Sequence, residues 1–295
     1  MKINGFKAFI CPLDGTALSE NEAGWSCAQG HHFDRAKEGY INLLPAHFKR
    51  SKDPGDSKTM VVARRAFLEA GYYEPLASFL AKLLSAYQDS FSGIENKFSI
   101  LDAGCGEGFY LREVLEHLRW ENDDFEWDAV GIDISKWAVQ SAAKKAKDLS
   151  WVVASNAQLP LPSDSMSIVL NVFGFAVYEE FFRIMKGDGM LIQVDPGSDH
   201  LKELREIIYP EVKKDSDNER EAGTGFKTFE RRSIRYKVLL ETQADIQNLL
   251  TMTPHRYRIS QESLIKLEQL ESLEVTVHFQ VHMMSKGKLP EITVH

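Results

Sequence analysis

Cysteine is rare in this chain of 295 residues, which has only Cys11, Cys27 and Cys105. Three cysteines are too few for a disulfide framework, and we expect all three to be reduced. Long apolar runs are missing as well. None approaches the ~18 residues that a membrane helix needs, and Met1 to Ile10 holds no apolar block of the kind found in signal peptides. These absences argue against a membrane partner and make the cytoplasm the expected location.

Positive charge is the next scarce feature. The chain has 35 Lys and Arg against 43 Asp and Glu, a net charge of −8 and a pI of about 5.7. This balance argues against a protein that coats nucleic acid nonspecifically, but it leaves room for a local basic groove. Three short clusters could line such a groove, and each is also compatible with a solvated face. They are Lys49 to Lys52, Arg64 with Arg65, and Arg231 to Arg235.

The stretch from Phe98 to Tyr110 carries the strongest local pattern in the chain. Apolar residues typical of a buried parallel strand are followed by three glycines and then by apolar residues at helical spacing. The glycines are Gly104, Gly106 and Gly108. Because they have no side chains, a ligand can lie directly against the backbone at the mouth of the sheet.

The composition of this loop narrows the choice of ligand. A Walker phosphate loop needs Gly-Lys-Ser/Thr, and nothing of that kind follows Gly108. A dinucleotide loop needs G-x-G-x-x-G, whereas this loop reads G-x-G-x-G and contains Glu107, whose carboxylate would repel a pyrophosphate. A cationic ligand without phosphate, such as S-adenosylmethionine, fits better. A tight turn that binds no ligand is the alternative.

Two further acids frame the glycine loop. Asp102 precedes it, and Asp133 ends the next apolar strand, where a carboxylate can accept hydrogen bonds from two ribose hydroxyls. After a third strand, Trp151 to Val153, the loop that contains Asn156 lies where it can hydrogen-bond the adenine edge. We therefore predict an S-adenosylmethionine site that includes Asp102, Asp133, Asn156 and the three glycines.

The order of elements predicts the fold class. Strands and helices alternate after the opening strand, as a doubly wound α/β sheet requires. Glu274 to Met284 alternates apolar and other residues and is predicted as the last strand, antiparallel at the sheet edge. Helices are expected over 60–70, 76–87, 136–146, 178–185, 201–209, 243–250 and 261–270.

The first forty or so residues have a different character. Cys11 and Asp14 form one pair of potential ligands, and Cys27 and His31 form a second pair about a dozen residues later. This is the layout of a small zinc module, which gains much of its folding energy from the metal. Cysteine is far commoner than aspartate in structural zinc sites, and His32 offers a competing donor. A metal-free finger that packs Phe9, Trp25 and Phe33 is therefore the alternative.

Several segments together resemble one family, the bacterial 23S rRNA guanine-N(1)-methyltransferases called RlmA. The resemblance runs from Cys11 to about Met284, and the finger spacing and the segments near residues 38–45 and 53–57 are more specific than the glycine loop. The matching segments are the finger, Ala36 to Pro45, Asp53 to Ser57, Ala63 to Leu68, Asp102 to Gly108, Gly131 to Lys136 and Met252 to Pro254.

The resemblance implies a class I, Rossmann-like methyltransferase sheet with a small N-terminal zinc-finger-like module. It places zinc on Cys11, Cys27 and His31, and S-adenosylmethionine against Tyr73, Gly106, Glu107 and His200. Two positions depart from the family. Asp14 stands where the family has its second cysteine, and Gly174 to Val177 stands where related enzymes usually have Ala-Pro-Cys-Lys.

The expected organisation follows from the resemblance. Residues 1–45 are the zinc-finger-like RNA-recognition module, residues 46–95 a helical lead-in that could fold over the cofactor, and residues 96–295 the Rossmann-like methyltransferase domain. The implied activity is S-adenosylmethionine-dependent methylation of N1 of a guanine in a hairpin loop of 23S ribosomal RNA. The finger and the Lys49 to Lys52 loop would grip the hairpin backbone, because an A-form major groove is closed to side chains. A homodimer is left open.

The chemistry at the acceptor is less legible. Guanine N1 carries a proton at neutral pH, and no residue can be named from the sequence as the base that removes it. Asn171 could hold the guanine edge or simply cap a loop, and Phe173 or Phe175 could stack on a flipped base or belong to the core. Rival functions are a small-metabolite methyltransferase, a non-catalytic RNA scaffold and, most distantly, an NAD-dependent enzyme.

Overall fold

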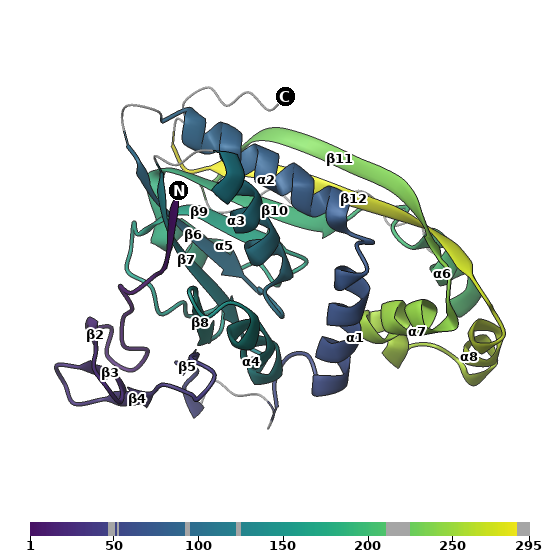
Figure 1. The fold of residues 1–295 in the computed structure, drawn as a ribbon, viewed down its shortest axis with the longest axis horizontal. Helices are drawn as coiled ribbons and strands as arrows, with labels where there is room; N and C mark the ends of the chain where they lie inside the picture. The colour runs from purple at the N-terminus through teal and green to yellow at the C-terminus, as the bar shows by residue number, and fades with distance from the viewer. Residues whose placement is uncertain (47–50, 52, 92–94, 122–124, 211–224, 288–295) are drawn as a thin grey trace.

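The computed structural model describes the chain except for residues 47–50, 52, 92–94, 122–124, 211–224 and 288–295 (Figure 1). The basic cluster from Lys49 to Lys52 therefore lies almost entirely outside the described residues. Among the described helices, none is long and apolar enough to cross a membrane.

A nine-stranded sheet forms the centre of the described structure (Figure 1). Its path runs β11-β12-β10-β9-β6-β7-β8-β5, and β1 lies beside β7. The strands are β1 (Lys2–Gly5), β5 (Ile41–Asn42), β6 (Lys97–Ala103), β7 (Glu126–Asp133), β8 (Ser150–Val153), β9 (Met166–Val172), β10 (Met185–Pro196), β11 (Lys227–Leu240) and β12 (Leu273–Ser285).

The strand pairing confirms the predicted α/β class. β6 pairs in parallel with β7 and β9, β7 with β8, and β9 with β10, so the carboxyl ends of these strands meet at one edge of the sheet. β12 is antiparallel, as predicted, but its expected place at the edge is wrong. It lies between β10 and β11, and β11 forms the end of the sheet.

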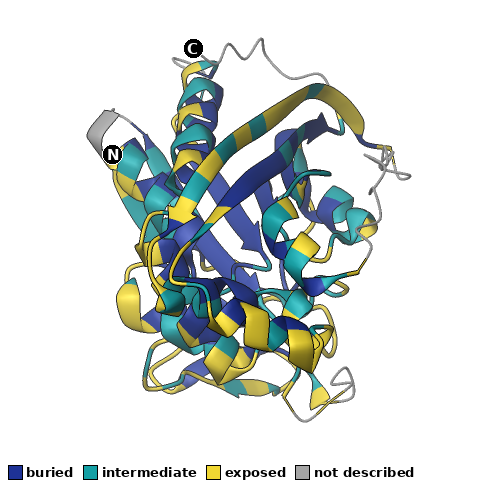
Figure 2. Cartoon of the chain, turned by 90° about the vertical axis from the view of Figure 1, so that its right-hand side faces the viewer, coloured by how far each residue is buried: buried dark blue, intermediate teal, exposed yellow. Residues whose placement is uncertain are grey.

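Two apolar cores cover the two faces of the sheet. Adjacent residues of a strand point to opposite faces, so Ile100 and Leu101 of β6 enter different cores. Figure 2 shows the central strands buried, whereas β11 at the end of the sheet is largely exposed. The helices are α1 (Lys58–Glu69), α2 (Glu74–Asp89), α3 (Phe109–Glu121), α4 (Lys136–Lys145), α5 (Tyr178–Ile184), α6 (Lys202–Ile208), α7 (Gln243–Met252) and α8 (Gln261–Glu268), with a short 3₁₀ turn, η2 (Pro254–Tyr257).

Helix starts follow local chemistry that the sequence carries. A hydroxyl side chain accepts a hydrogen bond from a backbone N–H of the first turn at each of four N-caps, which satisfies donors that the helix leaves unpaired. These caps are Ser57, Ser135, Thr242 and Ser260. Observed bounds lie within a few residues of the predicted helices. Lys186 to Gly189 form an irregular part of β10.

The N-terminal module is built on a small sheet of its own. It consists of β2 (Leu18–Glu20), β3 (Gly24–Cys27) and β4 (His32–Asp34) in the order β2-β3-β4. Phe9 and Trp25 pack edge to face at 5.1 Å between ring centroids and join the same core as α5. Because β1 and β5 flank this module and pair with β7 and β8, the module is fastened to the large sheet at both ends.

Candidate cofactor and metal sites

The predicted glycine loop joins the carboxyl end of β6 to α3 and adopts a conformation that favours glycine. The φ angles are 87° at Gly104, 55° at Gly106 and 80° at Gly108. A Cβ added at Gly108 would lie 2.4 Å from the Trp151 ring, whereas a Cβ at Gly106 would meet only the Arg64 side chain, at 3.8 Å. Gly108 is therefore required for packing, and Gly106 faces the more open side of the loop.

Asp133 is fixed beside this loop by two backbone donors. Its Oδ2 accepts a hydrogen bond from the Gly106 N–H at 2.9 Å, and its Oδ1 accepts one from the Ser135 N–H at 2.7 Å. Burial raises the pKa of this carboxyl, and the two backbone donors oppose that shift. The end of β7 thus presents an oriented carboxylate next to the glycine backbone, as the sequence predicts.

Asp102 lies at the end of β6 and is 1% exposed. Burial and then the charge of Asp133 raise its pKa to about 8, and its Oδ2 has no hydrogen-bond partner among the described residues. The Tyr110 hydroxyl, directly after the loop, is also buried and without a partner among the described residues. Buried polar atoms are normally paired, so these two atoms indicate a missing polar ligand.

Glu107 is buried on the α3 and α4 side of the loop. Its carboxylate oxygens lie 3.7 Å from Arg112 Nη2 and 3.7 Å from Lys145 Nζ. Burial raises the pKa of Glu107 to about 7, against the opposing effect of nearby arginines. The side chain is therefore engaged with cations of the protein, and any contact of this residue with a cofactor falls to its backbone.

Tyr73 and His200 are brought together from distant parts of the chain. Tyr73 Oη and His200 Nε2 are 3.3 Å apart, and His200 Nδ1 accepts a hydrogen bond from the His278 N–H at 3.2 Å. Burial lowers the pKa of His200 to about 3, so the ring is neutral and its one proton lies on Nε2, pointing at Tyr73. The Tyr73 hydroxyl proton is then free for another acceptor.

The loops after β8 and β9 meet over the glycine loop. Asn156 Nδ2 donates to the Phe175 carbonyl at 3.0 Å. Asn171 is fully buried, and its Nδ2 donates to the Ala103 carbonyl, so it caps a loop. Its Oδ1 has no hydrogen-bond partner among the described residues, and a contact of Asn171 with the guanine edge stays a prediction.

In the sequence, Arg64 is recognised only as part of a basic cluster, and its role inside the protein is missed. Its guanidinium donates twice to Asp56 Oδ2, at 2.8 and 3.1 Å, and once to the Met252 carbonyl at 2.9 Å. The Asp56 carbonyl in turn accepts from the Ser135 hydroxyl at 2.7 Å, beside Asp133. The lead-in thus folds against the end of β7. Arg64 and Met252 belong to two of the segments that carry the family resemblance, which was the available signal.

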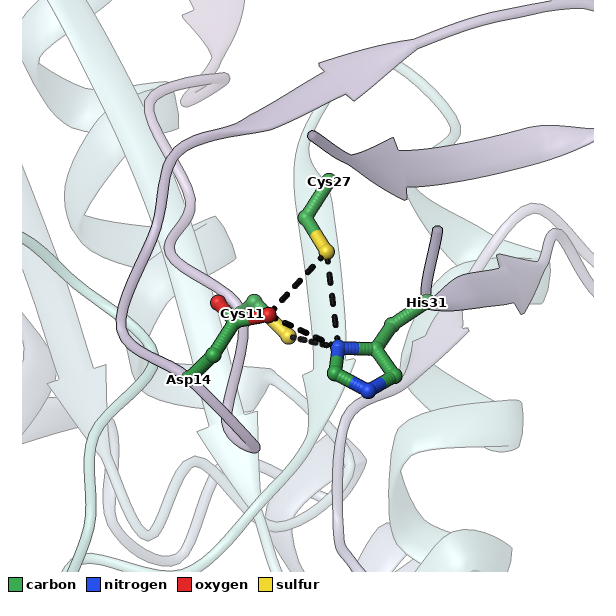
Figure 3. A group of neighbouring side chains, drawn as sticks. All are labelled: Cys11, Asp14, Cys27 and His31. Atoms are coloured by element: carbon green, nitrogen blue, oxygen red, sulfur yellow. Dashed lines mark hydrogen bonds and ion pairs between the residues drawn. The ribbon is translucent and has the colours of Figure 1, made fainter. Parts of the chain in front are cut away.

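The four predicted metal ligands converge in the N-terminal module (Figure 3). Their donor atoms all lie within 4.8 Å of one another. His31 Nδ1 is 3.5 Å from each of the two sulfurs and 2.8 Å from Asp14 Oδ2, which is 3.3 Å from Cys27 Sγ. The candidate ligands are Cys11, Asp14, Cys27 and His31; His32 instead contacts Ser26 and Asp34.

The two sulfur–nitrogen distances fit a tetrahedral zinc ion, whereas the 2.8 Å between His31 Nδ1 and Asp14 Oδ2 is that of a hydrogen bond. Typical Zn–S and Zn–N bonds at a tetrahedral angle put sulfur and nitrogen about 3.5 Å apart, as observed here. Asp14 is also oriented for coordination, because its Oδ1 accepts hydrogen bonds from the Thr16 N–H at 2.8 Å and the Thr16 hydroxyl at 2.6 Å. Oδ2 is thereby left to face the metal position.

The sheet carries a glycine loop and an acid at the carboxyl ends of adjacent strands, and a methyltransferase domain model matches residues 100–189. An N-terminal zinc-ribbon model described as "RlmA, N-terminal" matches residues 9–52. The chain belongs to the RlmA family of methyltransferases. Its cofactor is S-adenosylmethionine, and zinc is the metal of its N-terminal module.

Three curated relatives support this assignment. YxjB of Bacillus subtilis (strain 168), named for guanine-N(1) methylation of 23S rRNA, is 33% identical over 94% of this chain and 96% of its own length. The 23S rRNA (guanine(748)-N(1))-methyltransferase of Streptomyces fradiae is 36% identical over 70% of each chain. A protein of Micromonospora griseorubida, also named for guanine-N(1) methylation of 23S rRNA, is 32% identical over 66% of this chain and 67% of its own.

Proposed function

We propose that this protein uses S-adenosylmethionine to methylate N1 of a guanine in a hairpin loop of 23S ribosomal RNA. The observation that carries the proposal is that the zinc ribbon and the methyltransferase sheet are joined in one structure. A zinc ribbon is fastened through β1 and β5 to the sheet whose carboxyl ends hold the glycine loop and Asp133. A ribbon of this kind adds a recognition surface that an enzyme for a small metabolite does not need.

We assign the donor site to residues at and above the carboxyl ends of β6, β7 and β8. The methyl donor supplies a sulfonium that needs little activation, so these residues mainly position the reactants. Asp133 can accept hydrogen bonds from the ribose hydroxyls, and the glycines leave room for the donor. Asp102 and Tyr110 supply polar atoms that lack hydrogen-bond partners among the described residues. The assigned residues are Tyr73, Asp102, Gly104, Gly106, Glu107, Gly108, Asp133, Asn156 and His200.

The acceptor must lose the proton of guanine N1 as the new N–C bond forms. His200 is neutral, but its proton and its second nitrogen are both used in hydrogen bonds, so it is not assigned as the base. We assign the positioning of the target guanine to the loop after β9, which lies against the glycine loop. No proton acceptor is assigned.

We assign RNA binding to the ribbon, with a contribution from β11. Some of the basic residues on β11 are held in ion pairs, Arg235 with Asp199 at 2.8 Å and Arg232 with Glu230. Such pairs lower the net charge of the strand, so we assign the main role to the ribbon and to the basic cluster Lys49 to Lys52. The division into residues 1–45, 46–95 and 96–295 belongs to this proposal, as does action in the cytoplasm, where ribosomal RNA is found.

A homodimer is also part of the proposal, with β11 as the candidate contact. β11 lies at one end of the described sheet, so a second copy could pair along it. Sedimentation velocity at micromolar concentration should give a species of twice the chain mass of 33.5 kDa. A single species at the monomer mass would remove this part of the proposal without affecting the others.

The test of the proposed reaction is methylation of a large-subunit rRNA hairpin in vitro, followed by nucleoside mapping. Wild-type protein should yield N1-methylguanosine, and Asp133→Ala should lose at least about tenfold in donor affinity by calorimetry. Donor binding without any methylation of RNA would favour the alternative, a methyltransferase for a small metabolite. That alternative draws on the acidic pI and on the changed loop at Gly174 to Val177.

A further inference from the structure

The loop that leaves β9 places two phenylalanines in opposite environments. Phe173 has a positive φ of 57°, and its ring packs against other aromatic side chains. Its centroid lies 5.3 Å from Phe279 and 6.4 Å from His200. Phe173 is thus half-buried and packs against the aromatic side chains around Tyr73.

Gly174 carries the chain directly over the glycine loop. Its Cα would lie 3.2 Å from a Cβ added at Gly104. A Cβ on Gly174 itself would lie 2.5 Å from Asn171 Nδ2 and 2.7 Å from the Ala103 oxygen. No larger residue fits between these groups, so the loop is pressed against the donor site at this point.

Phe175, the next residue, is 83% exposed, the largest exposed fraction among the large apolar side chains of the described residues. Its backbone is nevertheless anchored, because its carbonyl accepts a hydrogen bond from Asn156 Nδ2 at 3.0 Å. The Phe175 ring is therefore exposed to solvent, while the backbone that carries it is fixed beside the glycine loop. An apolar ring held in this way is a platform on which an unstacked nucleobase can lie.

We propose that Phe175 is the stacking residue for the acceptor guanine and holds its N1 toward the donor methyl. The inference rests on the proposed methylation of RNA and adds to it the residue that receives the splayed base. It also gives a role to the departure at Gly174 to Val177, where Gly174 permits the close approach and Phe175 supplies the ring. A ring at this point selects for a planar base without reading its sequence.

The experiment compares Phe175→Ala, Phe175→Trp and a control, Ile265→Ala, with wild type on one rRNA hairpin. Ile265 is also an exposed apolar residue, at 46%, but lies on α8, which has no part in the assigned donor or RNA sites. Phe175→Ala should lower kcat/KM for RNA about tenfold or more, with unchanged donor affinity and melting temperature. Phe175→Trp should restore most of the loss, and Ile265→Ala should behave as wild type.

A second readout follows the base itself. With 2-aminopurine in place of the target guanine, wild type and Phe175→Trp should change its fluorescence on binding, and Phe175→Ala should not. A Phe175→Ala enzyme with kcat/KM within twofold of an active wild type would overturn the inference and leave the proposed function intact. A wild type that binds donor but never methylates the hairpin would overturn both.

Discussion

At the scale of the residue, the three acids around the glycine loop differ in their hydrogen bonds and ion pairs. Asp133 is held as an acceptor by two backbone N–H groups, whereas Asp102 is buried with one oxygen lacking a partner among the described residues. Asp102 is therefore mostly protonated and neutral in the free protein, and it becomes a carboxylate when a cationic ligand binds beside it. Glu107 is engaged with Arg112 and Lys145.

We predict that donor binding releases a proton from Asp102. Its pKa of about 8 keeps most molecules protonated at pH 7, and a bound ammonium or sulfonium nearby lowers that pKa. Calorimetry in buffers of different ionisation enthalpy should show release of about 0.9 proton at pH 7, falling toward zero at pH 9. Asp102→Asn should abolish the release.

Asp128→Asn provides the matched control for this measurement. Asp128 lies on β7 and pairs with Lys97 at 3.1 Å. The Asp128→Asn variant should release as many protons on donor binding as wild type does. Equal enthalpies for wild type in all buffers would show that Asp102 does not meet the charge of the donor.

The same raised pKa affects stability. The unfolded chain loses the Asp102 proton near pH 4, and the folded chain keeps it to about pH 8. Stability of the free protein should therefore fall as pH rises through this window. The slope of unfolding free energy against pH, measured by urea denaturation, should be smaller in Asp102→Asn; an unchanged slope would contradict this account.

Thr16 should influence zinc affinity without touching the metal. Its two hydrogen bonds hold Asp14 Oδ1, so Thr16→Ala should weaken zinc binding by about 10- to 100-fold. Competition with a chromogenic chelator measures this change. Ser26→Ala, which removes a contact to His32 outside the ligand set, should bind zinc as wild type does. Equal zinc affinity in Thr16→Ala would show that Asp14 is not oriented by Thr16.

At the scale of the element, the glycine loop separates two kinds of glycine. Gly108→Ala meets Trp151 at 2.4 Å and should destabilise folding by more than about 2 kcal/mol. Gly106→Ala has open space and should cost only about 1 kcal/mol in strain, yet reduce donor affinity about tenfold. Thermal denaturation and calorimetry separate the two effects. A Gly106→Ala variant with normal donor affinity would place the donor elsewhere.

The elements that local chemistry determines are the ones that the sequence predicts well. The β6 strand, its glycine loop, the end of β7 at Asp133 and the four zinc-site ligands all depend on short-range spacing, and the structure brings them together. The charged strand β11 was missed although Ile234, Tyr236 and Val238 alternate along it with Ser, Arg and Lys. The many charged residues of this segment obscure the alternation of apolar and polar residues that is typical of a strand.

Contacts between distant segments were beyond prediction. The place of β12 inside the sheet depends on its pairing with β10 and β11, which no local pattern encodes. The position of Arg64 likewise depends on Met252, which lies 188 residues away. For Phe173 and Phe175 the residue type is the same, and only the fold decides which ring is packed and which is exposed.

At the scale of the whole molecule, Arg64 links three regions around the donor site. It joins α1 to the 53–57 loop and to the end of α7, and α1 and α7 lie side by side (Figure 1). We expect Arg64→Ala to lower the unfolding free energy by about 1–2 kcal/mol and to weaken donor binding, because the lead-in loosens over the site. Chemical denaturation and calorimetry provide the two measurements.

Arg65→Ala removes the same charge at the next position of α1 and controls for electrostatics. It should leave the contacts to Asp56 and Met252 in place. If Arg64→Ala and Arg65→Ala weaken donor binding equally, the effect is one of charge alone, and the linking role of Arg64 is wrong.

The central claim is that S-adenosylmethionine binds at the glycine loop and that its methyl group is transferred to a guanine of 23S ribosomal RNA. The most direct measurement is mass spectrometry of 23S rRNA from a strain that lacks this gene, complemented with wild type or with Asp133→Ala. The account predicts that one N1-methylguanosine disappears in the deletion strain, returns with wild type and stays absent or strongly reduced with the variant. An rRNA whose methylated guanosines are the same in all strains would contradict it.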